Sequence, residues 1–149
     1  MIVRNPGFKP TDRTRLLMSV RKAVKFRVIN ARIANDHVEL DIEINSTSDI
    51  DELRLLGLKV LDVVNLDNNV EVINEQDERN SLIRYVELFN KERFWEAHEV
   101  LERIWHRNRD EGIRGLIILA AAFVKIQENN PEAFKRLMMT AKELIMNNE

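Results

Sequence analysis

Residues 37–44 have the sequence HVELDIEI, and this stretch decides how the first half of the chain folds. Apolar and polar residues alternate strictly along it, which is the period-two pattern of a strand with one buried face. The apolar set is Val38, Leu40, Ile42 and Ile44. A β-branched run over residues 24–29 precedes it, and a turn-like Asn-Asp pair at 35–36 separates the two runs. We therefore predict a β-hairpin.

The hairpin is expected to change which residues face inward near Asn30. Before this point the inward set is Val24, Phe26 and Val28, and after it the set is Ile29, Ala31 and Ile33. A switch of this kind needs a β-bulge. We also expect Arg32 to face Glu39 across the hairpin, as a cross-strand charge pair.

Two short helices are expected around the hairpin. The first would be capped by Thr11-Asp12 and carry Leu16, Leu17 and Val20. The second would be capped by Ser48 or Asp49, carry Ile50, Leu53 and Leu56, and stop at Gly57. Extended runs follow over residues 58–66 and 70–73. Residues 1–75 are thus expected to form a small α-β-β-α-β domain.

The apolar period becomes helical near residue 76. Four helices are predicted: one marked by Leu82, Val86 and Phe89, then residues 94–106, 111–128 and 131–146. Short loops between them predict antiparallel neighbours. The fold class is therefore α+β, with an antiparallel four-helix bundle over residues 76–149 after the small domain.

Composition excludes several classes of protein. The chain has 149 residues, no cysteine and four glycines. Disulfides, thiolate metal sites and a glycine-rich phosphate loop are therefore excluded. No apolar run reaches the ~18–20 residues of a membrane helix. We expect a soluble cytoplasmic protein.

The net charge of −2 hides a strong asymmetry. Residues 1–35 hold nine basic residues and one acidic residue, whereas residues 36–75 hold eleven acidic and two basic ones. One interpretation is nucleic-acid binding by the basic segment. The candidate residues are Arg13, Arg15, Arg21, Lys22, Lys25 and Arg27. The other interpretation is that the two segments neutralise each other.

The helix over residues 94–106 carries the strongest chemical signal. A projection at 100° per residue places His98 on the apolar face, Glu102 at its margin and Glu99 further out. One interpretation is a core hydrogen bond between His98 and Glu102. The other is a metal half-site of these two residues, with Glu99 as a helper or base, related to the His-Glu-x-x-His pattern of zinc hydrolases. His98, Glu99 and Glu102 are thus the candidate catalytic residues.

The same region resembles a known family. The strings FWEAHEVLE at 94–102, Trp105, RGLI at 114–117 and LAAA at 119–122 occur in order. Over about residues 80–146 this pattern resembles domain-of-unknown-function family 309. The resemblance implies a small helical bundle with a polar signature on His98, Glu99, Glu102 and Trp105. Arg114 stands where the family often has Gln. No activity is established for the family.

Three functions follow. The first is a binding or protein-interaction module, expected as a homodimer, in which an apolar face or groove near Trp95 and Glu99 meets a partner or a second copy. Its candidate ligand-binding residues are Trp95, Trp105 and Arg114. The second is a metal-assisted hydrolase using His98, Glu99 and Glu102, with Arg114 binding an anion. The third is nucleic-acid binding through the basic segment. The tryptophans have a simpler interpretation as core residues. No reaction can be named, and a divalent metal is the one cofactor considered.

Overall fold

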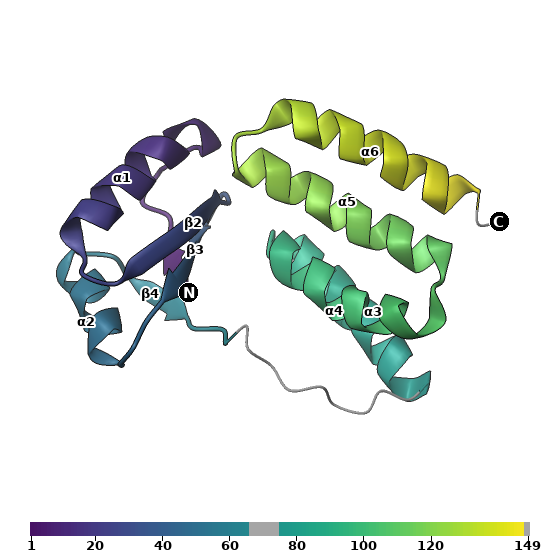
Figure 1. Cartoon of the computed structure of the whole chain (residues 1–149), viewed down its shortest axis with the longest axis horizontal. Coiled ribbons are helices and arrows are strands. Elements are labelled where there is room, and N and C mark those ends of the chain that lie inside the picture. The colour runs from purple at the N-terminus through teal and green to yellow at the C-terminus, as the bar shows by residue number, and fades with distance from the viewer. Residues whose placement is uncertain (66–74, 148–149) are drawn as a thin grey trace. The chain divides into compact units, whose positions relative to one another are not determined.

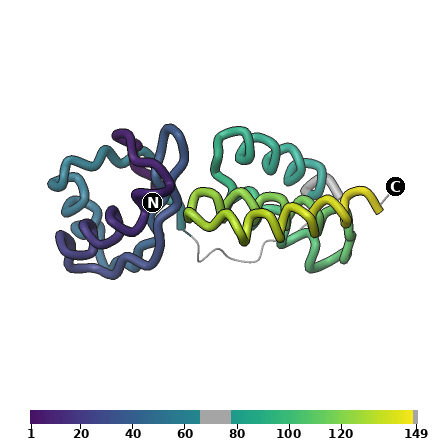
Figure 2. Tube along the Cα trace, turned by 90° about the horizontal axis from the view of Figure 1, so that it is seen from above, coloured from purple at the N-terminus to yellow at the C-terminus, as the bar shows by residue number. Residues whose placement is uncertain are grey.

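The computed structural model describes residues 1–65 and 75–147, and the chain divides into two compact units. One comprises Met1–Asn68 with Gln127–Asn129, and the other Asn69–Ile126 with Asn130–Glu149. The elements of the first are β1 (Ile2–Arg4), the 3-10 turn η1 (Pro10–Asp12), α1 (Arg13–Ala23), β2 (Arg27–Ile33), β3 (His37–Glu43), α2 (Ser48–Leu55) and β4 (Val60–Asp62). Those of the second are α3 (Glu75–Asn90), α4 (Phe94–Asn108), α5 (Glu111–Gln127) and α6 (Pro131–Met146) (Figures 1 and 2). The α+β class is confirmed.

The first unit is built on an antiparallel sheet with strand order β2-β3-β1-β4. Strand β1 was not predicted, and it lies between β3 and β4, where Val3 pairs with Val38 and with Val60. The extended run over 58–66 is shorter than expected, because β4 ends at Asp62. The run at 70–73 lies outside the described residues.

The predicted bulge in the hairpin is confirmed. The β2–β3 register shifts between Val28 and Asn30, so Ile29 is the extra residue. Its side chain is exposed, whereas those of Val28, Ala31 and Ile33 are buried. Ile29 was therefore wrongly placed in the inward set, since the bulge sends it outward.

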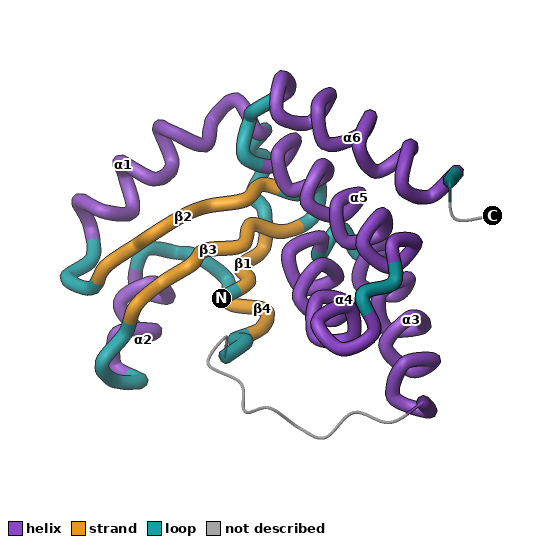
Figure 3. Tube along the Cα trace, turned by 45° about the vertical axis from the view of Figure 1, so that its right-hand side comes forward, coloured by secondary structure: helices purple, strands orange, loops and turns teal. Residues whose placement is uncertain are grey.

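One face of the sheet packs against α1 and α2 (Figure 3). The buried core joins Leu16, Leu17 and Val20 of α1 with Leu53 of α2 and with Ala31, Ile33, Val38 and Leu40 of the hairpin. Both predicted helices exist, but Thr47, and neither Ser48 nor Asp49, precedes α2 as its N-cap. Leu56 is exposed, contrary to prediction, because the helix has ended before it. Gly57 follows with φ +80°, the left-handed conformation of a helix stop.

The second unit is a helical bundle whose consecutive helices run in opposite directions (Figure 1). Its core is shared by α3, α4 and α5 and comprises Tyr85, Leu88, Ala97, Leu101, Ile104, Ile113, Ile117 and Ala120. Val86 was expected to be inward and is exposed. Gly115 allows α5 to approach α6 closely, since a Cβ there would lie 2.7 Å from Ile145 Cγ1. None of the described helices could span a membrane.

Candidate functional site

Helix α4 is held at both ends by local interactions. At its start, Arg93 donates from Nε and Nη2 to the two carboxylate oxygens of Glu96, at 2.5 and 2.8 Å. At its end, Arg109 takes the left-handed conformation with φ 56°, and its N–H donates to the carbonyl of Trp105 at 2.9 Å. The buried face is formed by Phe94, Ala97, Leu101 and Ile104. Because this face packs into the bundle, the polar flank of α4, which carries His98, Glu99 and Glu102, lies at the margin of the buried surface.

The three polar signature residues lie together on this flank. The Nδ1 atom of His98 is 3.3 Å from Oε1 of Glu99 and 3.7 Å from Oε2 of Glu102. One ligand atom from each residue lies within 4.8 Å of the other two. The side chains are 17%, 40% and 38% exposed for His98, Glu99 and Glu102, which matches the order expected from the helical projection. The cluster is therefore pre-assembled and open to solvent.

Aromatic rings flank the cluster. The indole of Trp95 stacks on the imidazole of His98, with ring centroids 5.3 Å apart and planes 9° from parallel. Trp105 packs against the bundle core. The guanidinium carbons of Arg109 and Arg114 lie over its ring, 4.4 and 5.9 Å from the ring centroid. Arg114 also pairs with Glu111 at 3.1 Å. Trp95 thus contacts the cluster, whereas Trp105 and Arg114 form a separate cation–π group.

His106 extends the polar flank by one more turn. Its Nε2 atom is 3.8 Å from Oε1 of Glu102, so the two oxygens of that carboxylate face two different histidines. The sequence predicted the His98–Glu102 pair from its i,i+4 spacing. The same spacing relates Glu102 to His106.

The comparison with family models agrees with this location. Residues 82–137 match the family described as Domain of unknown function (DUF309). The resemblance of the C-terminal half is thereby confirmed, and the DUF309 segment contains the whole of α4 and α5. No family model matches the N-terminal half. No curated protein and no solved structure matches the chain. The match to DUF309 covers the candidate site but assigns it no activity.

The basic residues of the N-terminal segment are largely occupied by internal partners. Arg13 donates to the carbonyl of Ala31, and Arg21 donates to the carbonyls of Val28 and Ile29, all at 2.9 Å. Arg15 pairs with Asp12, and Arg27 pairs with Glu43. Lys22 and Lys25 are exposed. Arg13 and Arg21 of α1 therefore bind backbone carbonyls of β2, the terminal strand of the sheet, and nucleic-acid binding stays a prediction.

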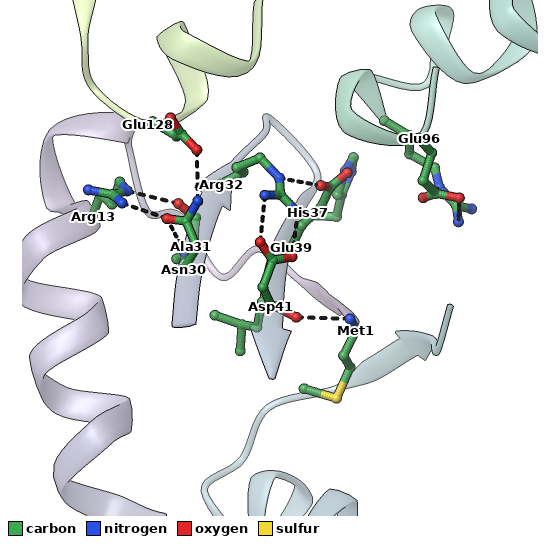
Figure 4. A network of polar contacts seen from close by, with 12 residues as sticks. Met1, Arg13, Asn30, Ala31, Arg32, His37, Glu39, Asp41, Glu96 and Glu128 are labelled. Atoms are coloured by element: carbon green, nitrogen blue, oxygen red, sulfur yellow. Dashed lines mark hydrogen bonds and ion pairs between the residues drawn. The ribbon is translucent and has the colours of Figure 1, made fainter. Parts of the chain in front are cut away.

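A second polar cluster lies on the hairpin face opposite α1 and α2 (Figure 4). Arg32 Nε donates to Glu39 at 2.7 Å, as the sequence predicted, and its terminal nitrogens donate to Asp41 at 2.5 and 2.7 Å. His37 lies beside them, with Nδ1 2.6 Å from Asp36 and Nε2 3.6 Å from Glu39. Sequence analysis missed His37 and Asp41, although alternation along β3 places both on the face of Glu39.

His37 should make the stability of the sheet depend on pH. Burial of the imidazole alone would lower the pKa of His37, but the carboxylates of Glu39 and Asp36 beside it outweigh burial and raise that pKa above 6.5. The protonated form is thus the one that folding favours. We expect the free energy of unfolding to be highest below about pH 6.5 and to fall as the pH rises through the raised pKa.

Urea unfolding between pH 5.5 and 9, followed by far-UV circular dichroism, measures this dependence. The control is His37→Gln, which removes the titrating ring and leaves His98 and His106 in place. An unchanged slope in that variant would show that His37 is not the group responsible.

Proposed function

We propose that the C-terminal bundle is a binding module whose site on α4 takes a divalent transition-metal ion through His98, Glu99 and Glu102. The observation that carries this proposal is the distance of at most 4.8 Å between their ligand atoms. Two ligands bound at ~2.1 Å to one ion lie at most about 4.2 Å apart. Small side-chain rotations therefore bring all three atoms within reach of one ion.

The chemistry of the donors favours particular ions. One imidazole nitrogen and two carboxylate oxygens suit zinc, manganese or ferrous iron better than calcium, which prefers an all-oxygen shell. The two carboxylates would balance the charge of a divalent ion. The stacked ring of Trp95 fixes the plane of His98, so Nδ1 is already directed at the carboxylates.

Isothermal titration of Zn²⁺ and Mn²⁺ into protein without a polyhistidine tag tests the proposal. We expect one ion per chain, at least tenfold weaker binding in Glu99→Gln and Glu102→Gln, and loss of binding in His98→Asn. The reason is that each variant removes one ligand atom from the set. The stacked Trp95 gives a second readout, because Co²⁺ bound beside it should quench its fluorescence.

Glu96→Gln is the matched control, since Glu96 lies on the same helix but its carboxylate is engaged by Arg93. Binding in this control should equal that of the unaltered protein. Absence of a stoichiometric ion, or equal binding in His98→Asn, would refute the metal site. The hydrolase alternative depends on the same three residues and stays a prediction.

A further inference from the structure

The polar flank of α4 contains one metal-binding side chain that the proposed site does not use. His98 and His106 are eight residues apart, which is about 12 Å along the helix axis. One ion therefore cannot bind both within the same chain. His106 is 58% exposed, and Glu102 is its one ion-pair partner among the described residues, at 3.8 Å.

The site on α4 is incomplete by itself. His98, Glu99 and Glu102 supply three ligand atoms, whereas a closed zinc-type site has four protein ligands. The missing ligand could come from a side chain that lies beside His98 after association. A nitrogen donor on an exposed helix face is what such a partner would need to offer.

The spacing of the flank is symmetric about Glu102. His98 lies four residues before Glu102, and His106 lies four residues after it. A two-fold axis at Glu102, perpendicular to α4, would place a second copy of α4 antiparallel to the first. His106 of the second copy would then lie beside His98 of the first, and the reverse would hold at the other site.

This arrangement agrees with the way helices pack. Residues 98, 102 and 106 form one i±4n row on the helix surface. Packing of two such rows is the commonest helix contact, with the axes about 8–10 Å apart and crossing at about −50°. The side chains of facing histidines and carboxylates span that distance, so the metal sites can form without rebuilding the helix.

We propose that metal loading joins two copies of this chain through α4, with His106 of each copy completing the site of the other. This rests on the proposed metal site. Without metal, Glu99 and Glu102 of the two copies would place four carboxylates close together, and their repulsion disfavours association. The ions remove that repulsion and supply the bonds, so the dimer should exist only when metal is bound.

Sedimentation velocity of tag-free protein tests this, with Zn²⁺ or with EDTA. We expect the mass of one chain, 17.5 kDa, in EDTA and twice that mass with Zn²⁺. His106→Ala should keep the fold by circular dichroism and still bind Zn²⁺, but remain monomeric at the same protein concentration. Arg136→Ala is the control, because Arg136 is exposed on α6 and not on the helix that carries the polar flank, and it should dimerise normally.

Mixing two defective variants gives a sharper result. Neither His98→Ala nor His106→Ala should dimerise alone, but a mixed pair has one intact site, made by His106 of the first and His98 of the second. We therefore expect dimers in the mixture, with one ion per two chains. Unaltered protein that binds metal but stays monomeric, or dimers unaffected by His106→Ala, would overturn this inference alone. Absence of metal binding in the unaltered protein would overturn the proposed function as well.

Discussion

Arg32→Ala is expected to lower the free energy of unfolding of the N-terminal unit by about 3–5 kcal/mol. The guanidinium is 4% exposed and is paired with Glu39, which is 5% exposed, at 2.7 Å. It also binds Asp41. Removal of the cation leaves a buried carboxylate whose remaining ionic partner, among the described residues, is His37. A buried charge left without adequate compensation is among the most destabilising changes known in proteins.

Amide hydrogen exchange of β2 and β3 measures this loss of stability in the N-terminal unit itself. Both tryptophans lie on α4, so tryptophan fluorescence reports on the bundle and not on the sheet. A loss of 3–5 kcal/mol should speed exchange of the most protected amides by roughly two to three and a half orders of magnitude.

Arg27→Ala is a closely matched control, because Arg27 is also on β2 and pairs directly across the hairpin with Glu43. These two side chains are 73% and 63% exposed, and an exposed pair contributes about 0–1 kcal/mol. Equal effects of the two substitutions would show that the Arg32 network is not buried in solution.

The hairpin could be predicted because its information is local. Alternation along residues 37–44 predicts a half-buried strand. The change near Asn30 in which residues are expected to face the core predicts the bulge. Strand β1 could not be predicted in this way. It has three residues without alternation, and it is a strand because Val3 pairs with Val38, far along the chain. Non-local pairing of this kind leaves no periodic signal in a short segment.

The part of the candidate site that lies on a single helix could also be predicted. An α-helix sets the positions of His98, Glu99 and Glu102 by its period alone, and the structure has them within 4.8 Å. Interactions through tertiary structure were missed. Arg114 lies over Trp105, a residue of another helix, and pairs with Glu111. The pair with Glu111 is local to α5, but the contact with Trp105 depends on how α4 and α5 pack, which the spacing of residues within one helix does not determine.

The charge asymmetry of the N-terminal half has a structural explanation, because two of its basic residues bind other parts of the same unit. The basic segment suggested a nucleic-acid surface, yet Arg13 and Arg21 donate to backbone carbonyls of β2. Unpaired edge carbonyls invite pairing with another chain, and natural sheets often protect them. These two arginines satisfy the edge of β2, which gives their presence in α1 a structural cause.

Leu101→Ala is expected to lower the free energy of unfolding of the bundle by about 3–5 kcal/mol. Leu101 is fully buried at the centre of the core shared by α3, α4 and α5. Truncation removes buried apolar surface and leaves a cavity whose walls are set by neighbouring helices. Its neighbours in that core include Leu88 and Ile117. Urea unfolding followed by tryptophan fluorescence measures this change, because both indoles lie on the same helix as Leu101.

Val86→Ala is the control that shows whether any truncation of an apolar side chain in the bundle lowers its stability, or only truncation of a core residue. Val86 is an apolar residue on α3 that is 54% exposed, so its truncation removes little buried surface and should change stability by at most about 0.5 kcal/mol.

Leu101 also lies on α4 between Glu99 and Glu102, and a cavity there loosens the helix that carries the ligands. Metal affinity should therefore fall in Leu101→Ala even under conditions where the variant is fully folded, and remain unchanged in Val86→Ala. Equal affinity in both variants would mean that the site does not depend on the packing beneath it.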